Sequence, residues 1–504
     1  MSVQDASVVR PAPPDRPASA SGLDVLDSAQ AGGRVVRGGV VRAVSYTLMM
    51  ALSVLSVALL TRHLGVVRFG YYTTVLSLVA VVAAVTDAGM TAVGVREFSV
   101  RSGAERDQLM RDLFGLRIAL SAVGALLVAG FALAAGYSTA LLAGAVLASL
   151  GTVALVVQHT HTIPIAAQLR IGTLAALELA RQALSVAAIV ALVALGAGVL
   201  PLLAVVPAVN LLLIAPTARL ARHGISLRVG VHPRGWLSLL RPTVSYSLAS
   251  AVGVIYVYTA QIVTSLVASE QQSGVFAASF RIFVVVGGIP YLLVGGALPL
   301  LARAARDDGE RLRYASARIF EVSLILGVAA ALCMLAGAQF MIAVVAGPRY
   351  AASAAVLQVQ GLALIASFVL AGWSFALVSL GRYRGVLLAN LAAFAVSCCA
   401  TAVLAGSLGA HGAALATVCA ESTLALGLFV ALARNDPWLR PGLAIVPKVA
   451  LAASPAAALA LAPGISSPVR TLLALVAYAL AIVLTRALPG EVLELLPARA
   501  RRAA

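Results

Sequence analysis

The sequence consists largely of apolar runs of about 20 residues separated by short polar segments. A helix of this length crosses the hydrocarbon of a bilayer because it bonds all of its own backbone N–H and C=O groups. Of the 504 residues, 61% are hydrophobic and 11% are charged, a balance that ordinary soluble domains do not reach. We therefore predict an all-α integral membrane protein.

About fourteen such runs are present, and they divide the chain. The predicted spans lie near 40–61, 71–94, 113–136, 139–158, 173–197, 199–218, 243–267, 275–302, 319–341, 354–380, 385–406, 412–433, 444–463 and 468–488. The first six spans form a predicted N-lobe (40–220), and the next six form a predicted C-lobe (243–434). Two more helices follow (444–488). A basic cytoplasmic linker (221–242) joins the lobes. The polar segments 1–39 and 489–504 are expected to be cytosolic tails, the first disordered and without a signal peptide.

The basic residues predict the orientation of these spans. Short cytoplasmic loops retain an excess of Arg and Lys. With the N-terminus inside, 29 of the 36 basic residues lie in inside segments and only four in outside loops, while Arg117, Arg181 and Arg281 remain at membrane depth. We therefore expect both termini to be cytoplasmic. Because the positive charges are scattered through loops, they do not indicate a nucleic-acid partner.

Two short segments recur in the two predicted lobes. RAVSY at 42–46 and FGYY at 69–72 are echoed by RPTVSY at 241–246 and SGVF at 273–276. Related lobes are typical of transporters that alternate access around a central site.

Seven ionisable residues fall at membrane depth, where a charge is costly and usually functional: Asp87, Arg117, Glu178, Arg181, Arg281, Glu321 and Glu421. Arg117 and Glu321 lie near predicted cytoplasmic ends, where their side chains could reach water. Glu178 and Arg181 are three residues apart and could either neutralise one another or line a pathway.

Arg281 differs from these residues because glycines and prolines follow it in the same span, in RIFVVVGGIPYLLVGGALP. Such a sequence predicts a bent or weakened helix beside a fixed cation. A guanidinium binds phosphate through two parallel hydrogen bonds, so Arg281 would suit a diphosphate-bearing cargo. The alternative is an interhelical ion pair with Asp87 or Glu421.

The sequence contains no motif of a known catalytic or nucleotide site. It has no nucleophile elbow, no HExxH, no GxxxxGK[ST] loop and no long outside loop with paired carboxylates. The four cysteines lie inside apolar runs, and the pair His159 and His161 lacks a third ligand nearby. We therefore expect neither an enzyme nor a metal or cofactor site.

Several stretches in a fixed order resemble the polysaccharide flippases (Wzx-type) of the multidrug/oligosaccharidyl-lipid/polysaccharide exporter (MOP) superfamily. They are LGVVRFGYYTTVLSLVAVVAAVTDAGMTAVGVRE at 64–97, GVFAASFRIF at 274–283, GPRYAASAAVLQVQGLAL at 347–364, GRYRGVLLANLAAF at 381–394 and GAHGAALATVCAE at 409–421.

The resemblance implies a fourteen-helix, two-lobe fold with a central cationic cavity. It also implies flipping of an undecaprenyl-diphosphate-linked oligosaccharide across the bacterial cytoplasmic membrane, beside polysaccharide polymerase or assembly proteins. The chain departs from the family where an acid and an arginine are frequent, since it has Ala260 and Gln261 there. The alternatives are a lipid II flippase or multidrug antiporter of the same superfamily and, from another class, a membrane glycan polymerase or ligase. Arg281, Asp87, Glu421, Glu178, Arg181 and Arg117 are the candidate pathway residues.

Overall fold

The computed structural model describes residues 31–488 except 88, 169, 222–229, 242–243 and 296–297. The described residues form helices joined by short connections, and they contain no strand, which confirms the predicted all-α fold. Residues 1–30 of the first predicted tail, the tail at 489–504 and the centre of the linker lie outside the described residues.

The N-lobe begins with a long helix that bends. Gly65 has φ 70° and ψ 177° inside α1, so α1 consists of two helices that meet at this residue; the positive φ is one that glycine adopts at little cost. The predicted span 71–94 is interrupted, because α1 ends at Asp87 and α2 begins after Gly89. The helices of this lobe are α1 (Ala31–Asp87), α2 (Met90–Val100), α3 (Gly103–Ala134), α4 (Thr139–Ala167), α5 (Ile171–Ala194) and α6 (Val199–Ala221).

The C-lobe follows the linker helix α7 (Pro233–Leu240). The predicted span 275–302 falls in α9, α10 and α11. Gly288, between α9 and α10, keeps helical φ and ψ of −75° and −22°, so the expected weakening of this span by its glycines and prolines stays a prediction. The elements of this lobe are α8 (Val244–Val267), α9 (Glu270–Gly287), α10 (Ile289–Gly295), α11 (Leu298–Asp307), α12 (Gly309–Val345), η1 (Pro348–Tyr350), α13 (Ser353–Ser379), α14 (Tyr383–Leu408), α15 (Ala410–Asn435) and η2 (Pro437–Leu439).

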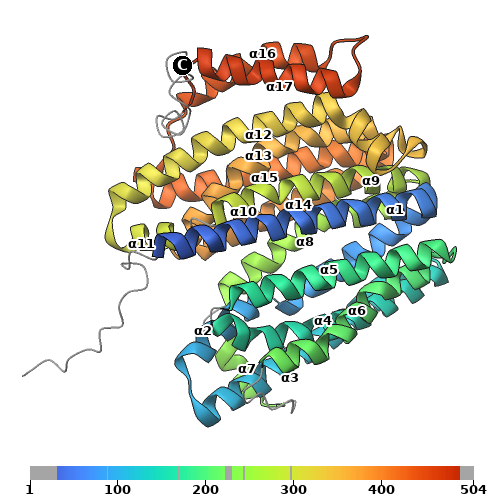
Figure 1. The fold of residues 1–504 in the computed structure, drawn as a ribbon, viewed down its shortest axis with the longest axis vertical. Coiled ribbons are helices and arrows are strands. Elements are labelled where there is room, and N and C mark those ends of the chain that lie inside the picture. The colour runs from blue at the N-terminus through green and yellow to red at the C-terminus, as the bar shows by residue number, and fades with distance from the viewer. Residues whose placement is uncertain are drawn as a thin grey trace, which may run out of the picture.

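Two further helices, α16 (Ile445–Ala460) and α17 (Ser467–Leu484), pack against each other and against α12, at the edge of the molecule (Figure 1). Twelve helices of the described residues are long and apolar enough to cross a membrane. With α1 counted as two helices, and with the shorter apolar helix α16 included, they make fourteen spans. The chain is therefore a multi-pass membrane protein.

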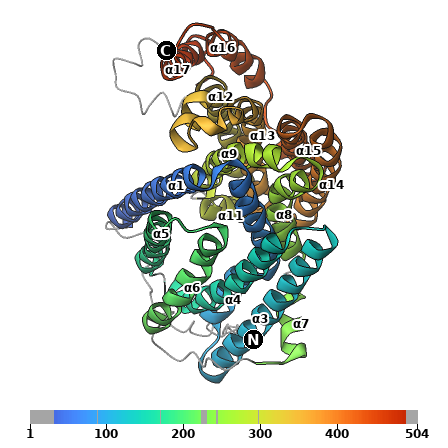
Figure 2. The ribbon, with the colours of Figure 1, turned by 90° about the vertical axis from the view of Figure 1, so that its right-hand side faces the viewer.

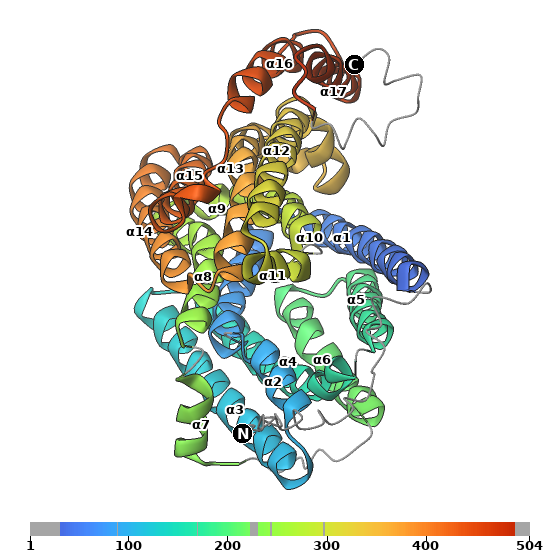
Figure 3. The same cartoon turned by 90° about the vertical axis from the view of Figure 1, so that its left-hand side faces the viewer.

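The spans run across the molecule between two ends, which we name after the predicted orientation. The inner end carries α2, α7 and α11 together with the start of α1 and the end of α17, toward the left of Figure 1. The outer end carries the bend at Gly65 and the 3-10 helix η1, and is seen in Figure 2. The view onto the inner end in Figure 3 shows α2–α6 grouped apart from α8 and α12–α15.

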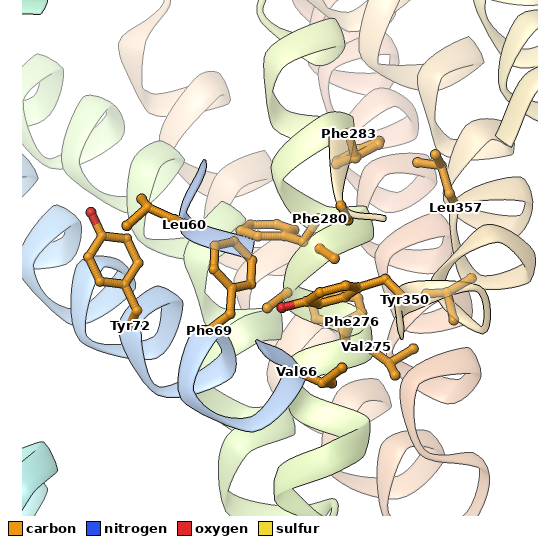
Figure 4. Packing of buried hydrophobic residues seen from close by; sticks show 14 of the residues in the cluster. Leu60, Val66, Phe69, Tyr72, Val275, Phe276, Phe280, Phe283, Tyr350 and Leu357 are labelled. Carbon is orange, nitrogen blue, oxygen red and sulfur yellow. The ribbon is translucent and has the colours of Figure 1, made fainter. Parts of the chain in front are cut away.

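The two lobes pack together tightly toward the outer end. The largest buried apolar cluster combines residues of α1 with residues of α9, η1 and α13, as Figure 4 shows. The ring of Phe69 meets that of Tyr350 edge-on, with centroids 6.1 Å apart. Because this core is shared by both lobes, it holds the outer end closed.

Inter-lobe hydrogen bonds also lie at the outer end. Tyr350 donates to the carbonyl of Thr61 (3.3 Å), Arg62 donates to the carbonyl of Val344 (2.8 Å), and Tyr137 bonds Ser265 (2.8 Å). The glycines of the two repeated segments, FGYY and SGVF, face each other here: a Cβ on Gly70 would lie 3.0 Å from the Cα of Gly274. The repeated segments of the two lobes therefore lie at the interface between the lobes.

Candidate functional site

Arg281 lies near the middle of its span. It follows the start of α9 by eleven residues, about 16 Å along a helix axis, which is roughly half of a 30 Å hydrocarbon core. Its Nη2 atom is buried and has no hydrogen-bond partner among the described residues. A buried donor of a charged group is costly when it is unpaired, so this atom is available to an anion.

Arg281 is also the one charged residue lining a cavity of about 210 Å³ between α1, α9 and α12. The other lining residues are apolar: Met50, Val54 and Val57 on α1; Ile282, Val285 and Val286 on α9; and Phe340, Met341, Val344 and Val345 on α12. A fixed cation beside an apolar wall can accept a ligand that combines an anionic group with a hydrocarbon chain.

The two acids considered as ion-pair partners of Arg281 have other partners in the structure, so the alternative of an interhelical ion pair is wrong. Asp87 forms its ion pair with Arg117, and Glu421 accepts hydrogen bonds from Tyr256 and Ser367. Asp87 lies in the N-lobe and Glu421 deep in the C-lobe, so each is satisfied within its own lobe.

Asp87 and Arg117 form the centre of a polar network in the N-lobe. Arg117 also donates to Thr91 (2.7 Å) and Thr160 (3.1 Å), and Thr91 donates to Asp87 (2.6 Å). The side chain of Arg117 is 0% exposed, whereas that of Asp87 is 44% exposed. The expectation that Arg117 reaches water at the membrane surface is therefore wrong: the neighbouring helices enclose it.

Glu178 and Arg181 extend the charged region along α5. They pair at 2.5 Å across one helical turn, as their spacing predicted. His159 on α4 lies 3.8 Å from Glu178 and within electrostatic range of Asp87 and Arg117. The structure thus brings four of the six predicted pathway residues together in the N-lobe and leaves Arg281 and Glu421 in the C-lobe, in separate cavities.

The remaining membrane-depth acid, Glu321, pairs with Arg318 at 2.5 Å on the same helix. Among the described residues no group of three or more His, Cys, Asp and Glu side chains could hold a metal ion. The two departures from the family pattern lie at the lobe interface: Ala260 is buried there, and Gln261 donates to Thr74 and Ser273, each at 3.2 Å.

Sequence reasoning missed the residues that surround Glu421, above all Tyr256 and Ser367. Hydroxyl side chains are common in membrane helices, where they bond their own helix. Nothing in the sequence marks two of them as partners of a carboxylate 165 and 54 residues away.

Comparison with known proteins agrees with this architecture. Residues 59–355 match the model of a family described as polysaccharide biosynthesis protein. No curated protein sequence matches the chain.

Two solved structures show the fold. The lipid II flippase MurJ, in an inward closed conformation, has a TM-score of 0.74 at 12% identity over 90% of this chain and 99% of that chain. An inward-facing multidrug resistance MATE family transporter of the MOP superfamily has a TM-score of 0.60 at 14% identity over 78% and 94%.

The family match covers more than half of the chain. The chain therefore belongs to the polysaccharide biosynthesis protein family, and its fold is similar to those of these two solved structures.

Proposed function

We propose that the protein flips an undecaprenyl-diphosphate-linked oligosaccharide from the inner to the outer leaflet of a bacterial cytoplasmic membrane, for cell-surface polysaccharide synthesis. Both termini are cytoplasmic in this proposal. The cargo crosses by alternating access without making or breaking bonds, and a glycan polymerase or other assembly proteins use it on the outer side.

The observation that carries this proposal is the state of Arg281. A cation near the centre of the bilayer, with a buried donor unpaired and an apolar wall beside it, is costly unless it serves a ligand. A diphosphate supplies the oxygens that a guanidinium binds in pairs, and a polyprenyl chain is compatible with the apolar wall.

The lobe packing supports alternating access. The shared apolar core and the inter-lobe hydrogen bonds lie at the outer end, so a cargo would enter from the inner end in this conformation. Asp87, Glu178 and Arg181 supply charged, partly exposed groups in the N-lobe that would contact the polar saccharide.

Depletion of the protein in its host tests the proposal. Lipid-linked oligosaccharide should accumulate in the inner leaflet and surface glycan should fall, and re-expression of the wild type should reverse both changes. Unchanged surface glycan together with increased drug sensitivity would indicate that the protein is a multidrug transporter and not a flippase. Accumulation of peptidoglycan precursor instead would assign lipid II as the cargo.

A further inference from the structure

The C-lobe contains a second cavity, separate from that of Arg281. It measures about 480 Å³ and lies among α8, α9, α10, α13, α14 and α15. Its wall is mainly aromatic and apolar, and Glu421 is the one carboxylate that lines it. The lining residues come from the inner halves of their helices: Ala249 lies near the start of α8, Val378 near the end of α13, and Tyr383 begins α14.

Glu421 lies at the depth where this cavity stops. It is eleven residues into α15, and its partners Tyr256 and Ser367 are twelve and fourteen residues into α8 and α13, so all three are near the middle of the membrane. Toward the outer end a much smaller cavity of about 10 Å³ follows, lined by Ala260, Ser397, Thr417 and their neighbours. Glu421 therefore borders open space on one side and packed helices on the other.

The carboxylate is buried without a cation. Glu421 is 6% exposed, and no arginine, lysine or histidine of the described residues forms an ion pair with it. The titratable groups that face it are the hydroxyls of Tyr256 on α8 and Tyr291 on α10. The residues of α9, α13 and α14 that line the two cavities beside it carry no charge; they include Phe280, Phe283, Ser367, Asn390 and Ser397. A permanent negative charge at this depth is costly, so the site favours a cation that can arrive and leave.

Ser367 can form a hydrogen bond with the carboxyl of Glu421 in both its ionised and its protonated state. Its Oγ lies 2.7 Å from Oε2 of Glu421 and 3.1 Å from the carbonyl oxygen of Ala363. A hydroxyl has one hydrogen and can donate to only one of these acceptors at a time. Tyr256 donates to the other carboxyl oxygen, Oε1, at 2.8 Å.

We propose that Glu421, with Tyr256 and Ser367, is a proton-binding site that couples proton movement to the conformational cycle. The inference rests on the proposed function as a transporter with alternating access. In the present conformation a proton passes from water in the large cavity to Oε2 of Glu421. The new carboxyl O–H donates to Oγ of Ser367, whose hydrogen turns to the Ala363 carbonyl. After the lobes open outward, the proton leaves to water on that side, and Ser367 donates to the carboxylate again.

Infrared difference spectroscopy of the full chain in lipid nanodiscs, without cargo, tests the binding step. Lowering the pH should produce a carboxylic-acid C=O band that Glu421→Gln removes. The matched control Glu321→Gln, which changes an acid paired with Arg318, should leave the band in place. Ser367→Ala should shift the pH at which the band appears. Ser367→Thr, which keeps the hydroxyl, should restore the wild-type pH of this transition. A band unaffected by Glu421→Gln, or a spectral response of Glu421 to Na⁺ at constant pH, would overturn the proposal.

Counterflow in proteoliposomes tests coupling separately. Wild-type protein should move a lipid-linked oligosaccharide faster under an imposed pH gradient than under a sodium gradient. Glu421→Gln should lose the stimulation by the pH gradient. Equal stimulation of wild type and Glu421→Gln would refute coupling. If the infrared band titrates as expected but no lipid-linked oligosaccharide moves, the proton site stands and the proposed cargo fails.

Discussion

The backbone of Gly274 in α9 lies directly against that of Val66 in α1: a Cβ atom on Gly274 would lie 2.1 Å from the Val66 carbonyl oxygen. Backbone atoms cannot move aside as the end of a flexible side chain can. The closed outer end therefore depends on the absence of a side chain at residue 274.

Gly274→Ala should shift the protein toward a conformation in which the outer end is open. Overpacking of this kind costs about 1–3 kcal/mol, a factor of roughly 5 to 150 in the equilibrium between two states. In a cysteine-free background, maleimide labelling of Thr74→Cys, a position that is 1% exposed, should become correspondingly faster. The control Gly130→Ala introduces a Cβ with nothing within 4 Å and should change nothing. Equal labelling rates in both variants would contradict this role of Gly274.

The sequence was sufficient to predict the membrane spans but not all of their interruptions. Apolar runs of about 20 residues identify a span without tertiary information. The break at Gly89 was missed because a single glycine inside an apolar run does not by itself end a helix.

Among the charged residues, pairs within one helix follow from the sequence, whereas pairs between helices do not. The pair Glu178 and Arg181 follows from helical periodicity, since residues three apart share one face. The pair Asp87 and Arg117 joins different helices 30 residues apart, and only the packing of α1 against α3 determines it. For the same reason the sequence could not show that Asp87 and Glu421 are unavailable to Arg281.

Substitution of Asp87 and substitution of Arg117 should lower the stability of the protein by different amounts. Asp87→Ala leaves a fully buried guanidinium uncompensated, which is expected to cost about 3–5 kcal/mol. Arg117→Met leaves a carboxylate that is 44% exposed and can be solvated, so its cost should be smaller. Thermal unfolding of the purified variants in detergent would measure both effects. The double variant should be more stable than Asp87→Ala alone; if it is not, the ion pair does not explain the loss.

The distribution of basic residues predicts the topology. Single cysteines placed in the segments 95–112 and 303–318 of a cysteine-free protein should be labelled by a membrane-impermeant maleimide only after the cells are opened. A cysteine in place of Arg349, in the outer-end element η1, should be labelled in intact cells. Labelling of either of the first two segments in intact cells would reverse the inner and outer ends and, with them, the proposed direction of cargo entry.

Arg281 should be required for transport and not for folding, because the structure gives it no ion pair with Asp87 or Glu421 to lose. Arg281→Ala should abolish surface glycan at unchanged protein abundance. Arg281→Lys keeps the charge but cannot form paired hydrogen bonds with a phosphate, so it should retain partial activity. The control Arg470→Ala removes an arginine of α17 that bonds the Ala336 carbonyl at 3.0 Å and should leave surface glycan near normal. If Arg281→Ala instead lowered abundance in step with glycan, while Arg281→Met restored both, the residue would be needed only for packing and the cargo would bind elsewhere.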